Sequence, residues 1–245
     1  MNYLSGLTIQ SGIAYGKIHK INPTKESETN LDLYINQKDI LNQALQTSSE
    51  ALEQAINLST IEFNDRIAMI FEAHKLMVKD PMLLEETYRY IDQGMNAYQA
   101  YKTAAENIIS QFKKLSSDYM VNRIIDIEDA TDRVLYAIQD KTYELNLAFD
   151  HPKILVLPEM KPSLILNVDR KHISGFIVAS GSYDQHASVI ARKKGIPSII
   201  IDNAMKLINE DDLVLLDGIK GIVYLNPSAD ILKNYAIKGD ESDEL

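Results

Sequence analysis

The sequence predicts an α/β domain that is built from two segments of the chain and interrupted by a four-helix subdomain. Only one glycine, Gly94, and one proline, Pro81, lie between residues 25 and 145. Because glycine and proline punctuate regular structure, their scarcity indicates helices in this region. Short runs rich in Ile and Val follow residue 150, and such runs are typical of buried strands. A similar run at 12–20 has no partner in the helical region, so we place it in the sheet of the C-terminal part.

Apolar residues in the helical region recur at steps of three and four, which is the pattern of one buried helix face. Four such stripes predict the helices of a subdomain at 30–143. Asp80-Pro81 combines a favoured N-cap residue with a proline at the first helical position. We therefore expect one helix to end near Lys79 and another to run to Gln93. The stripes are Leu41, Leu45, Ser48, Leu52 and Ala55; Ile67, Ile70, His74 and Met77; Tyr101, Ala104, Ile108, Phe112 and Leu115; and Ile124, Ile127, Thr131, Val134 and Ile138.

Residues 1–24 and 146–238 form the predicted α/β domain. Its apolar runs alternate with helix-like stretches near 186–194 and 228–237, as in an α/β arrangement. The acidic end of the sequence, 239–245, is expected to be a flexible tail. The apolar runs are 153–157 (KILVL), 175–179 (GFIVA), 198–201 (SIII), 213–216 (LVLL) and 222–225 (IVYL).

Composition restricts the class of protein. The 245 residues are 45% apolar and 24% charged, as in ordinary globular proteins, and we expect no membrane insertion because no apolar run is long enough. The N-terminal residues lack the features of a secretory signal. The chain has no Cys, which excludes disulfides, zinc thiolate sites and Cys nucleophiles and agrees with a cytoplasmic location. A net charge of −10 argues against a nucleic-acid partner.

Among the five histidines, His186 has the most informative context. It follows an apolar run and Gly181, and it precedes a helix-like stretch through Arg192. A side chain at a helix start lies near backbone N–H groups without intrahelical acceptors, and these groups favour anions. A neutral imidazole can also attack a phosphoryl group and carry it as phosphohistidine. The context therefore indicates phosphoryl chemistry, although a histidine that merely begins a helix would have the same pattern.

The segment around His186 resembles the active-site stretch of the phosphohistidine (swivelling) domain of phosphoenolpyruvate-utilising enzymes. That pattern is Gly-Gly-x-Thr-Ser-His, then a small residue, an apolar helix ending in Ala-Arg, a short turn and Pro. The sequence keeps Gly181, His186, Ala191-Arg192 and 195–197 (GIP). The family includes Enzyme I of the sugar phosphotransferase system, pyruvate phosphate dikinase and phosphoenolpyruvate synthase.

Three further segments resemble Enzyme I in particular. Ser5-Gly6 together with 12–17 (GIAYGK) is similar to the N-terminal strand segment of that enzyme. The stretch 70–77 (IFEAHKLM), followed by Asp80-Pro81, is similar to the kinked helix that docks the small carrier protein HPr. The stretch 122–135 (NRIIDIEDATDRVL) is similar to the last helix of the same subdomain. The resemblance spans nearly the whole chain and implies the order strand, inserted bundle and phosphohistidine domain.

The resemblance implies a phosphotransferase in which His186 accepts a phosphoryl group and passes it to HPr. In the family, phosphoenolpyruvate and Mg²⁺ bind to a C-terminal barrel domain, which these residues do not include. We therefore expect no cofactor in this chain, no use of phosphoenolpyruvate by the chain alone, and a separate phosphoenolpyruvate-binding domain as a partner. The residues implied in HPr binding are Phe71, His74, Met77, Met82, Leu83 and Arg123.

The sequence departs from the family pattern beside His186. Asp184 stands in place of the family's Thr and Gln185 in place of its Ser, while Lys161 aligns with another Thr that hydrogen-bonds near the histidine. An Asp before a helix can cap the free N–H groups and so occupy the anion site. Two negative charges about 4 Å apart also repel by about 4 kcal/mol at an effective dielectric constant of about 20. Lys161 and Arg192 are the cations expected to offset this charge.

Three interpretations remain open from the sequence. In the first, His186 is phosphorylated and the site has adapted to Asp184. In the second, the fold persists without the chemistry, and the protein binds HPr or another partner as a regulator. In the third, the chain is a helical interaction module on an α/β base with an unrelated ligand. Asp126 and Asp129 form an acidic pair without a metal-ligand context, which is typical of a solvated helix face.

Overall fold

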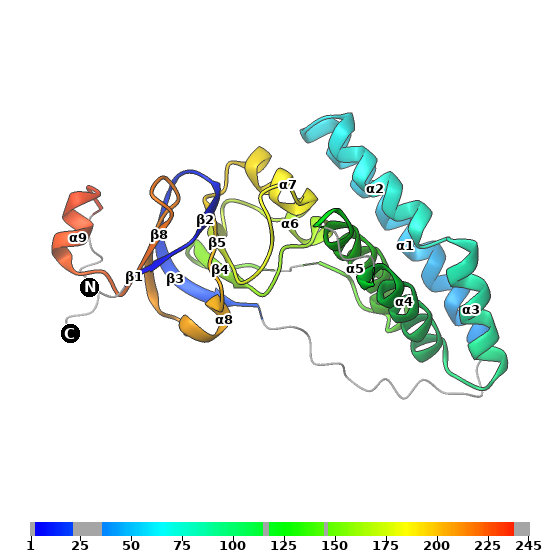
Figure 1. The fold of residues 1–245 in the computed structure, drawn as a ribbon. Helices are drawn as coiled ribbons and strands as arrows, with labels where there is room; N and C mark the ends of the chain where they lie inside the picture. Colours follow the sequence, from blue (N-terminus) through cyan, green and yellow to red (C-terminus); the bar gives the residue numbers. More distant parts are fainter. Residues whose placement is uncertain (1–2, 22–35, 115–117, 145–146, 238–245) are drawn as a thin grey trace. The chain divides into compact units, whose positions relative to one another are not determined.

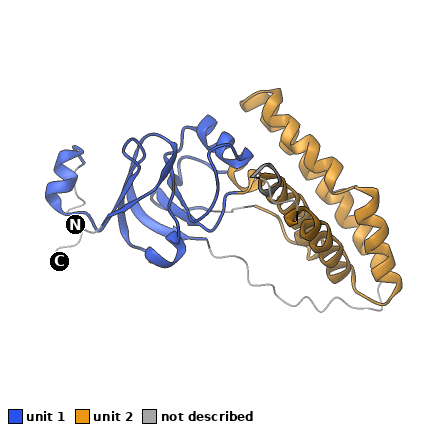
Figure 2. Ribbon diagram, viewed as in Figure 1, with its two compact units in different colours: residues 1–24, 146–160, 168–245 blue, residues 25–145, 161–167 orange. Residues whose placement is uncertain are grey.

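The computed structural model describes residues 3–21, 36–114, 118–144 and 147–237. The chain forms two compact units, whose helices and strands are labelled in Figure 1 and which are coloured separately in Figure 2. Unit 1 consists of residues 1–24, 146–160 and 168–245, and unit 2 of residues 25–145 and 161–167. The segment 161–167 therefore clusters with the helical unit, although the sequence analysis assigned it to the α/β domain. The predicted acidic tail at 239–245 lies outside the described residues.

The described residues of unit 2 form helices and the turns between them, with no strand. The unit contains five long helices rather than four, because the helix that begins at Pro81 is a separate element, and a short helix, α6 (Pro162–Leu166), joins them. None of the described helices combines the length and the apolar character that a membrane crossing requires. The long helices are α1 (Gln37–Glu62), α2 (Asp65–Met77), α3 (Pro81–Asp92), α4 (Ala97–Lys113) and α5 (Asp118–Ile138).

Asn and Asp side chains cap the starts of four of these helices. Asn36, Asn64 and Asn96 each accept a hydrogen bond from a backbone N–H in the first turn of the helix that follows. Asp80 Oδ1 accepts two such bonds in α3, at 2.9 and 3.2 Å, and proline occupies the first helical position. The helix start predicted there is confirmed. Each cap of this kind contributes about 1 kcal/mol.

The predicted apolar stripes face the interior of unit 2. Every residue of the first stripe is buried in α1, and every residue of the fourth stripe is buried in α5. In α4, the buried position in the C-terminal half is Ile109 rather than Ile108. Ile109 packs with Ile124 and Ile127 of α5, and the partly buried Met77 of α2 joins this cluster. Burial of these faces against one another holds the helices together.

Unit 1 is built on a mixed sheet of eight strands in the order β1-β8-β7-β3-β4-β5-β6-β2. The neighbours from β3 to β6 are parallel and the remaining pairs are antiparallel. All six apolar runs predicted as strands are present, whereas β1 and β2 were not predicted. The strands are β1 (Tyr3–Ser5), β2 (Leu7–Gln10), β3 (Ile13–Lys20), β4 (Lys153–Leu157), β5 (Ile173–Val178), β6 (Ser198–Ile200), β7 (Leu213–Asp217) and β8 (Ile222–Leu225). Unit 1 also contains α7 (His186–Lys194), α8 (Ala204–Leu207) and α9 (Ala229–Asn234).

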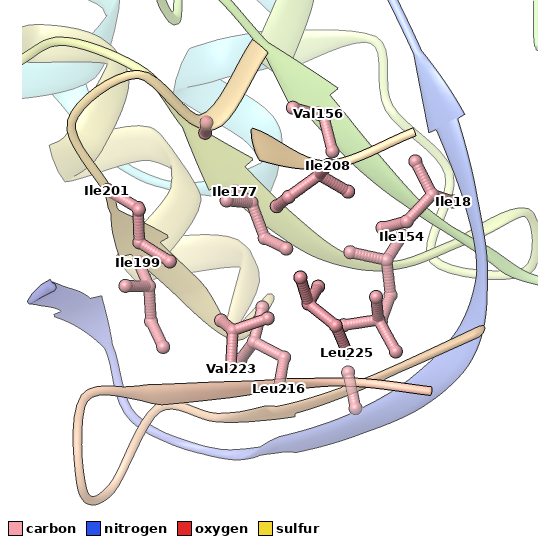
Figure 3. Close-up of a cluster of buried hydrophobic side chains, with 13 residues drawn as sticks. Ile18, Ile154, Val156, Ile177, Ile199, Ile201, Ile208, Leu216, Val223 and Leu225 are labelled. Atoms are coloured by element: carbon pink, nitrogen blue, oxygen red, sulfur yellow. The ribbon is translucent and has the colours of Figure 1, made fainter. Parts of the chain in front are cut away.

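Strand β3 joins the N-terminal segment to the rest of unit 1. Its first half pairs antiparallel with β7, and its end pairs parallel with β4. The N-terminal run therefore completes the C-terminal sheet, as the sequence predicts. Alternate residues of the strands point to one face and, with residues in and after α8, form the apolar core that is shown in Figure 3. The buried residues of this core are Ala14, Ile18, Ile154, Val156, Ile177, Ile199, Ile201, Ala204, Ile208, Val214, Leu216, Val223 and Leu225.

A single residue, Gly6, separates the two edge strands of the sheet. Because β1 pairs with β8 and β2 pairs with β6, the opposite edges of the sheet meet at Gly6, and the sheet must curl. The Gly6 N–H donates a hydrogen bond to Gly221 O (3.0 Å). A Cβ at Gly6 would lie 1.9 Å from Ile200 O, so only glycine permits this approach. Gly6 thus allows one N-terminal segment to pair with both ends of the sheet.

Hydrogen bonds to Asp217 attach the segment after α9 to the β7–β8 hairpin. Tyr235 Oη donates to Asp217 Oδ2 (2.7 Å), and the backbone N–H groups of Ile219 and Lys220 donate to Asp217 Oδ1 (2.9 Å each). Burial by itself would raise the pKa of the Asp217 carboxyl. The hydrogen bonds and the nearby Lys220 ammonium outweigh burial, so the pKa lies below its ordinary value.

Replacing Gly6 tests the closure of the sheet. We expect Gly6→Ala to destabilise unit 1 by about 3 kcal/mol, because the new Cβ collides with backbone rather than with a flexible side chain. Gly195→Ala is the matched control in the same unit. Gly195 has a positive φ of 64°, but a Cβ there would meet only the end of the Arg170 side chain, so the cost is about 1 kcal/mol of backbone strain. Urea unfolding followed by circular dichroism measures both, and equal losses would contradict the steric argument.

Replacing Asp217 tests its contribution to acid stability. A carboxyl whose pKa is lowered by folding stabilises the protein above its unfolded pKa of about 3.9, and this contribution is lost as the pH falls through the folded pKa. Asp217→Asn should therefore flatten the dependence of unfolding free energy on pH in the acid range. Urea unfolding at neutral and at acid pH measures the difference. Asp150→Asn, at an exposed carboxylate of the same unit, is the control. If the unfolding free energy of Asp217→Asn depends on acid pH as in the wild type, the lowered pKa assigned to Asp217 is refuted.

Candidate active site

The loop between β5 and α7 carries the sequence motif. β5 ends at Val178, and α7 is a helix of nine residues that begins at His186. The His186 side chain is half-buried. Gly195 ends α7 in the left-handed conformation, with φ of 64°. The structure therefore places His186 at the first position of a helix, as the sequence analysis expected.

Two side chains of α7 hold the preceding loop. Ser188 Oγ donates a hydrogen bond to Ser182 O (2.7 Å), and Arg192 Nη1 donates to Tyr183 O (2.5 Å). The Arg192 guanidinium also lies over the Tyr183 ring, with Cζ 3.9 Å from the ring centroid. The sequence analysis did not identify Ser188 or Tyr183. Ser188 has a signal in the sequence, because it lies four residues before Arg192 and therefore on the same face of the helix, whereas Tyr183 has none.

A third contact involves the residue directly before His186. The Gln185 side chain is 5% exposed and folds over Gly181. A Cβ at Gly181 would lie 2.9 Å from Gln185 Oε1, and Gly181 has a positive φ of 148°, so glycine is required there for two reasons. One residue earlier, Ser180 Oγ donates to Pro158 O (2.9 Å) at the end of β4. The loop is thus fixed both to α7 and to the sheet of unit 1.

The start of α7 receives no capping hydrogen bond from the side chain of its own N-cap residue. The N-cap residue is Gln185, and its side chain makes no capping hydrogen bond. Asp184 is exposed and, within the described part of the chain, takes part in no hydrogen bond or ion pair. The capping role considered for Asp184 is therefore not what the structure shows. His186 thus lies at a helix start, a position that in general favours an anion.

Lys161 has a carboxylate partner inside unit 2. Its Nζ donates to Asp132 Oδ2 of α5 (2.6 Å). Burial by itself would lower the pKa of the Lys161 ammonium. The carboxylates of Asp132, Asp129 and Glu128 outweigh burial, and the pKa is raised above its ordinary value. The expectation of a cation available to offset Asp184 is corrected: the Lys161 charge is already paired.

A buried polar cluster links α2, α5 and α6 in unit 2. The fully buried His74 ring lies between two carboxylates, with Nε2 3.7 Å from Asp126 Oδ1 and Nδ1 3.7 Å from Asp129 Oδ2. Asp129 Oδ2 also accepts a hydrogen bond from Ser163 N (2.8 Å), which fixes the start of α6. Asp126 and Asp129 are 3% and 0% exposed, so the expectation of a solvated face is wrong for this pair.

Two further groups of this cluster have shifted pKa values. Burial lowers the pKa of the Arg133 guanidinium, and Asp129 and Tyr143 oppose that shift. Burial, reinforced by Asp129 and Asp132, raises the pKa of the Tyr143 hydroxyl well above its ordinary value. Arg133 Cζ lies 5.6 Å from the centroid of the Tyr143 ring. Across the described ranges, no group of three or more His, Cys, Asp or Glu side chains is arranged to hold a metal ion.

The side chains expected to bind HPr differ in exposure. Phe71, His74 and Leu83 are between 0% and 2% exposed and belong to the interior of unit 2, because apolar residues at helical spacing are usually core. The expectation that these three side chains contact a partner directly is therefore corrected. Met77 and Arg123 are half-buried, and Met82 is 72% exposed. The sequence analysis missed three other exposed apolar side chains of this unit, which are Ile61, Met69 and Leu76.

Two sequence models of protein families match the chain. The N-terminal domain of PEP-utilising enzymes matches residues 5–123, and the mobile domain of PEP-utilising enzymes matches residues 149–221, which include His186. Together the two matches cover most of the chain. The chain therefore belongs to the phosphoenolpyruvate-utilising enzymes. Within this class it is similar to the N-terminal region of Enzyme I, the phosphoenolpyruvate-protein phosphotransferase.

Individual relatives and solved structures agree with this assignment. The phosphoenolpyruvate-protein phosphotransferase of Mycoplasma capricolum is 30% identical over 99% of this chain and 43% of its own length. That of Bacillus subtilis is 28% identical over 97% of this chain and 42% of its own length. A solution structure of Enzyme I (nEIt) matches 95% of this chain and 96% of its own, with a TM-score of 0.65 and 25% identity. The N-terminal domain of Enzyme 1 - Nitrogen has the same fold, covering 95% of this chain and 98% of its own with a TM-score of 0.61 and 22% identity.

The chain spans about two fifths of the length of the curated relatives that it matches. What those longer proteins do therefore enters only as a proposal for this chain.

Replacing Asp129 tests the buried cluster. Asp129→Ala should destabilise unit 2 by about 3 kcal/mol, because it leaves the buried Ser163 N–H without an acceptor and removes a carboxylate that interacts with buried Arg133. Asp132→Ala is the matched control on the same helix. It removes a partly exposed ion pair with Lys161 and should cost less than about 1 kcal/mol. Thermal unfolding ranks the two variants, and the reverse order would rule out Asp129 as the centre of the cluster.

Proposed function

We propose that this chain carries a phosphoryl group on His186 and exchanges it with HPr or a similar carrier protein. One observation supports this most directly: His186 is the first residue of α7, a helix whose N-cap residue, Gln185, makes no side-chain capping hydrogen bond. Family membership adds to it, because His186 lies in the part that matches the mobile domain of PEP-utilising enzymes. A neutral imidazole beside an anion-binding helix start suits both attack on phosphorus and storage of the added charge.

The proposed step moves a phosphoryl group between two imidazoles. An unprotonated ring nitrogen of His186 attacks the phosphorus of a phosphohistidine on the carrier. The new N–P bond forms as the N–P bond of the carrier breaks, and the electron pair of that bond returns to the carrier's imidazole. The proton that the His186 ring loses on becoming neutral phosphohistidine is balanced by the proton that the carrier's ring takes up. Because one N–P bond replaces another of the same kind, the exchange is reversible.

The charges around His186 act in opposite directions. The helix start stabilises the phosphoryl group, and partial charges of this kind contribute up to about 1 kcal/mol each. Asp184 is close in sequence and opposes the phosphoryl charge. Arg192 of α7 supplies a positive charge, and its contact with Tyr183 holds that charge beside the loop that carries Asp184. We assign the offset of Asp184 to Arg192 rather than to Lys161.

Exposed apolar side chains of unit 2 support a docking surface for the carrier. Met69 and Leu76 are seven residues apart on α2, so they lie on one helix face, and Met82 follows in the first turn of α3. They are 62%, 75% and 72% exposed. Grouped apolar side chains on a surface commonly mark partner contacts, and Met adapts well to them. We assign the carrier contact to these three side chains in place of Phe71, His74 and Leu83.

A second candidate function is binding of the carrier without transfer. The observation that favours it is the pair Asp184 and Gln185, which replace the Thr and Ser of the family pattern beside His186. In that case the chain would act as a regulator through the same surface of unit 2.

Phosphate transfer from phospho-HPr separates the two candidates. The wild type should acquire an acid-labile, base-stable phosphate, and His186→Ala should acquire none, because the accepting nitrogen is gone. His151→Ala, at an exposed histidine of unit 1, is the matched control and should be labelled like the wild type. Labelling of His186→Ala would refute the assignment of the acceptor. Binding of HPr without any label would establish the second candidate instead.

A further inference from the structure

The Gln185 side chain combines two properties that rarely occur together. It is 5% exposed and lies against Gly181. Within the ranges that the structure describes, however, its amide takes part in no hydrogen bond, neither as a cap of α7 nor with any other group. Most buried polar side chains have a hydrogen-bond partner, because burial without one costs free energy. The place of this amide therefore calls for an explanation other than packing.

The Gln185 amide is held in place and is still accessible to a ligand. The fully enclosed polar atoms that lack a partner in the described chain do not include its oxygen or its nitrogen. The tip of the side chain therefore keeps contact with solvent, although most of the residue is covered. The lack of a side chain at Gly181 makes room for this arrangement, since a Cβ there would lie 2.9 Å from Gln185 Oε1. An amide that is fixed before its ligand arrives loses little freedom on binding.

The amide belongs to the residue next to the proposed phosphoryl acceptor. Gln185 and His186 are consecutive, so their Cα atoms are about 3.8 Å apart. Phosphoryl oxygens accept hydrogen bonds, and a bond from an N–H group to such an anion is charge-assisted. A Gln amide offers two N–H donors, whereas the Ser of the family pattern offers one O–H donor. The amide without a partner and the phosphoryl oxygens are therefore chemically complementary.

We propose that Gln185 binds the phosphoryl group on His186 through its side-chain amide. The N–H groups of Gln185 Nε2 donate to the phosphoryl oxygens when His186 is phosphorylated. The phosphorylated form is thereby stabilised relative to the free form, in which the amide has no partner in the described chain. The inference rests on the proposed function for the acceptor and goes beyond it by assigning a residue that contacts the phosphoryl group.

Nuclear magnetic resonance of the Gln185 side chain tests the contact without a carrier protein. Phosphoramidate transfers its phosphoryl group to histidine chemically and releases ammonia, and the label on His186 is the one that His186→Ala lacks. Labelling of the wild type should shift the Nε2 proton signals of Gln185 downfield and slow their exchange with solvent. The side-chain signals of Gln10, whose Nε2 donates to Ser11 O within unit 1, should not change.

Gln185→Met separates binding of the phosphoryl group from packing. Met has a similar length and no hydrogen-bond donor, so it keeps contact with Gly181 but removes the amide. The equilibrium constant for phosphate uptake from phospho-HPr should fall by about tenfold, the effect of one charge-assisted hydrogen bond. The unphosphorylated variant should resist urea at least as well as the wild type, because it buries no amide. Gln10→Met is the matched control and should leave uptake unchanged.

Each outcome supports or overturns the proposal. Shifted Gln185 signals, reduced uptake and undiminished stability in Gln185→Met support it. Unchanged Gln185 signals on labelled His186, or uptake by Gln185→Met equal to that of the wild type, overturn it, and a loss of stability would assign the amide a structural role instead. If phospho-HPr transfers nothing, the proposed function fails, whereas the signals after labelling with phosphoramidate still decide whether Gln185 binds the phosphoryl group. If phosphoramidate does not label His186 either, both are overturned.

Discussion

The position of His186 at the first residue of α7 is the constraint around which the candidate site is arranged. Four backbone N–H groups at a helix start lack intrahelical acceptors, and proteins usually satisfy them with a nearby side chain. Here the N-cap residue, Gln185, is buried against Gly181 and makes no capping hydrogen bond with its side chain. A histidine at a helix start lies where the partial positive charge of the helix favours an anion.

Unit 2 contains buried charged side chains inside its helical bundle, and these need partners. Asp129 is fully buried and faces the His74 ring on one side and the start of α6 on the other. A buried carboxylate without partners would be expensive, and removal of one partner from such a cluster costs more than the cluster contributes. The cluster therefore explains why segment 161–167 belongs to unit 2, although β4 and β5 on either side of it belong to unit 1.

The elements that the sequence predicted are those whose signals are local. Strands β3 to β8 are apolar runs, and α3 begins with its own Asp-Pro cap, so each could be identified from a few neighbouring residues. β1 and β2 have three and four residues and depend on β8 and β6 for their hydrogen bonds, so nothing local distinguishes them from a loop. α6 was missed for the same reason, because its first turn is fixed by Asp129, a residue distant in the chain.

By itself, the sequence determined the two-part organisation and the position of His186 at a helix start, because periodicity, glycine turns and proline act over short stretches. It also carried the resemblance to Enzyme I. Only the tertiary structure decided which side chains are available. Phe71, His74 and Leu83 share a helical pattern with exposed neighbours such as Leu76, and only packing against other helices decides which face is covered. In the same way, Lys161 forms an ion pair with Asp132, and Arg192 stacks on Tyr183. The free energy of such contacts depends on interatomic distances, and these are set only when the chain folds.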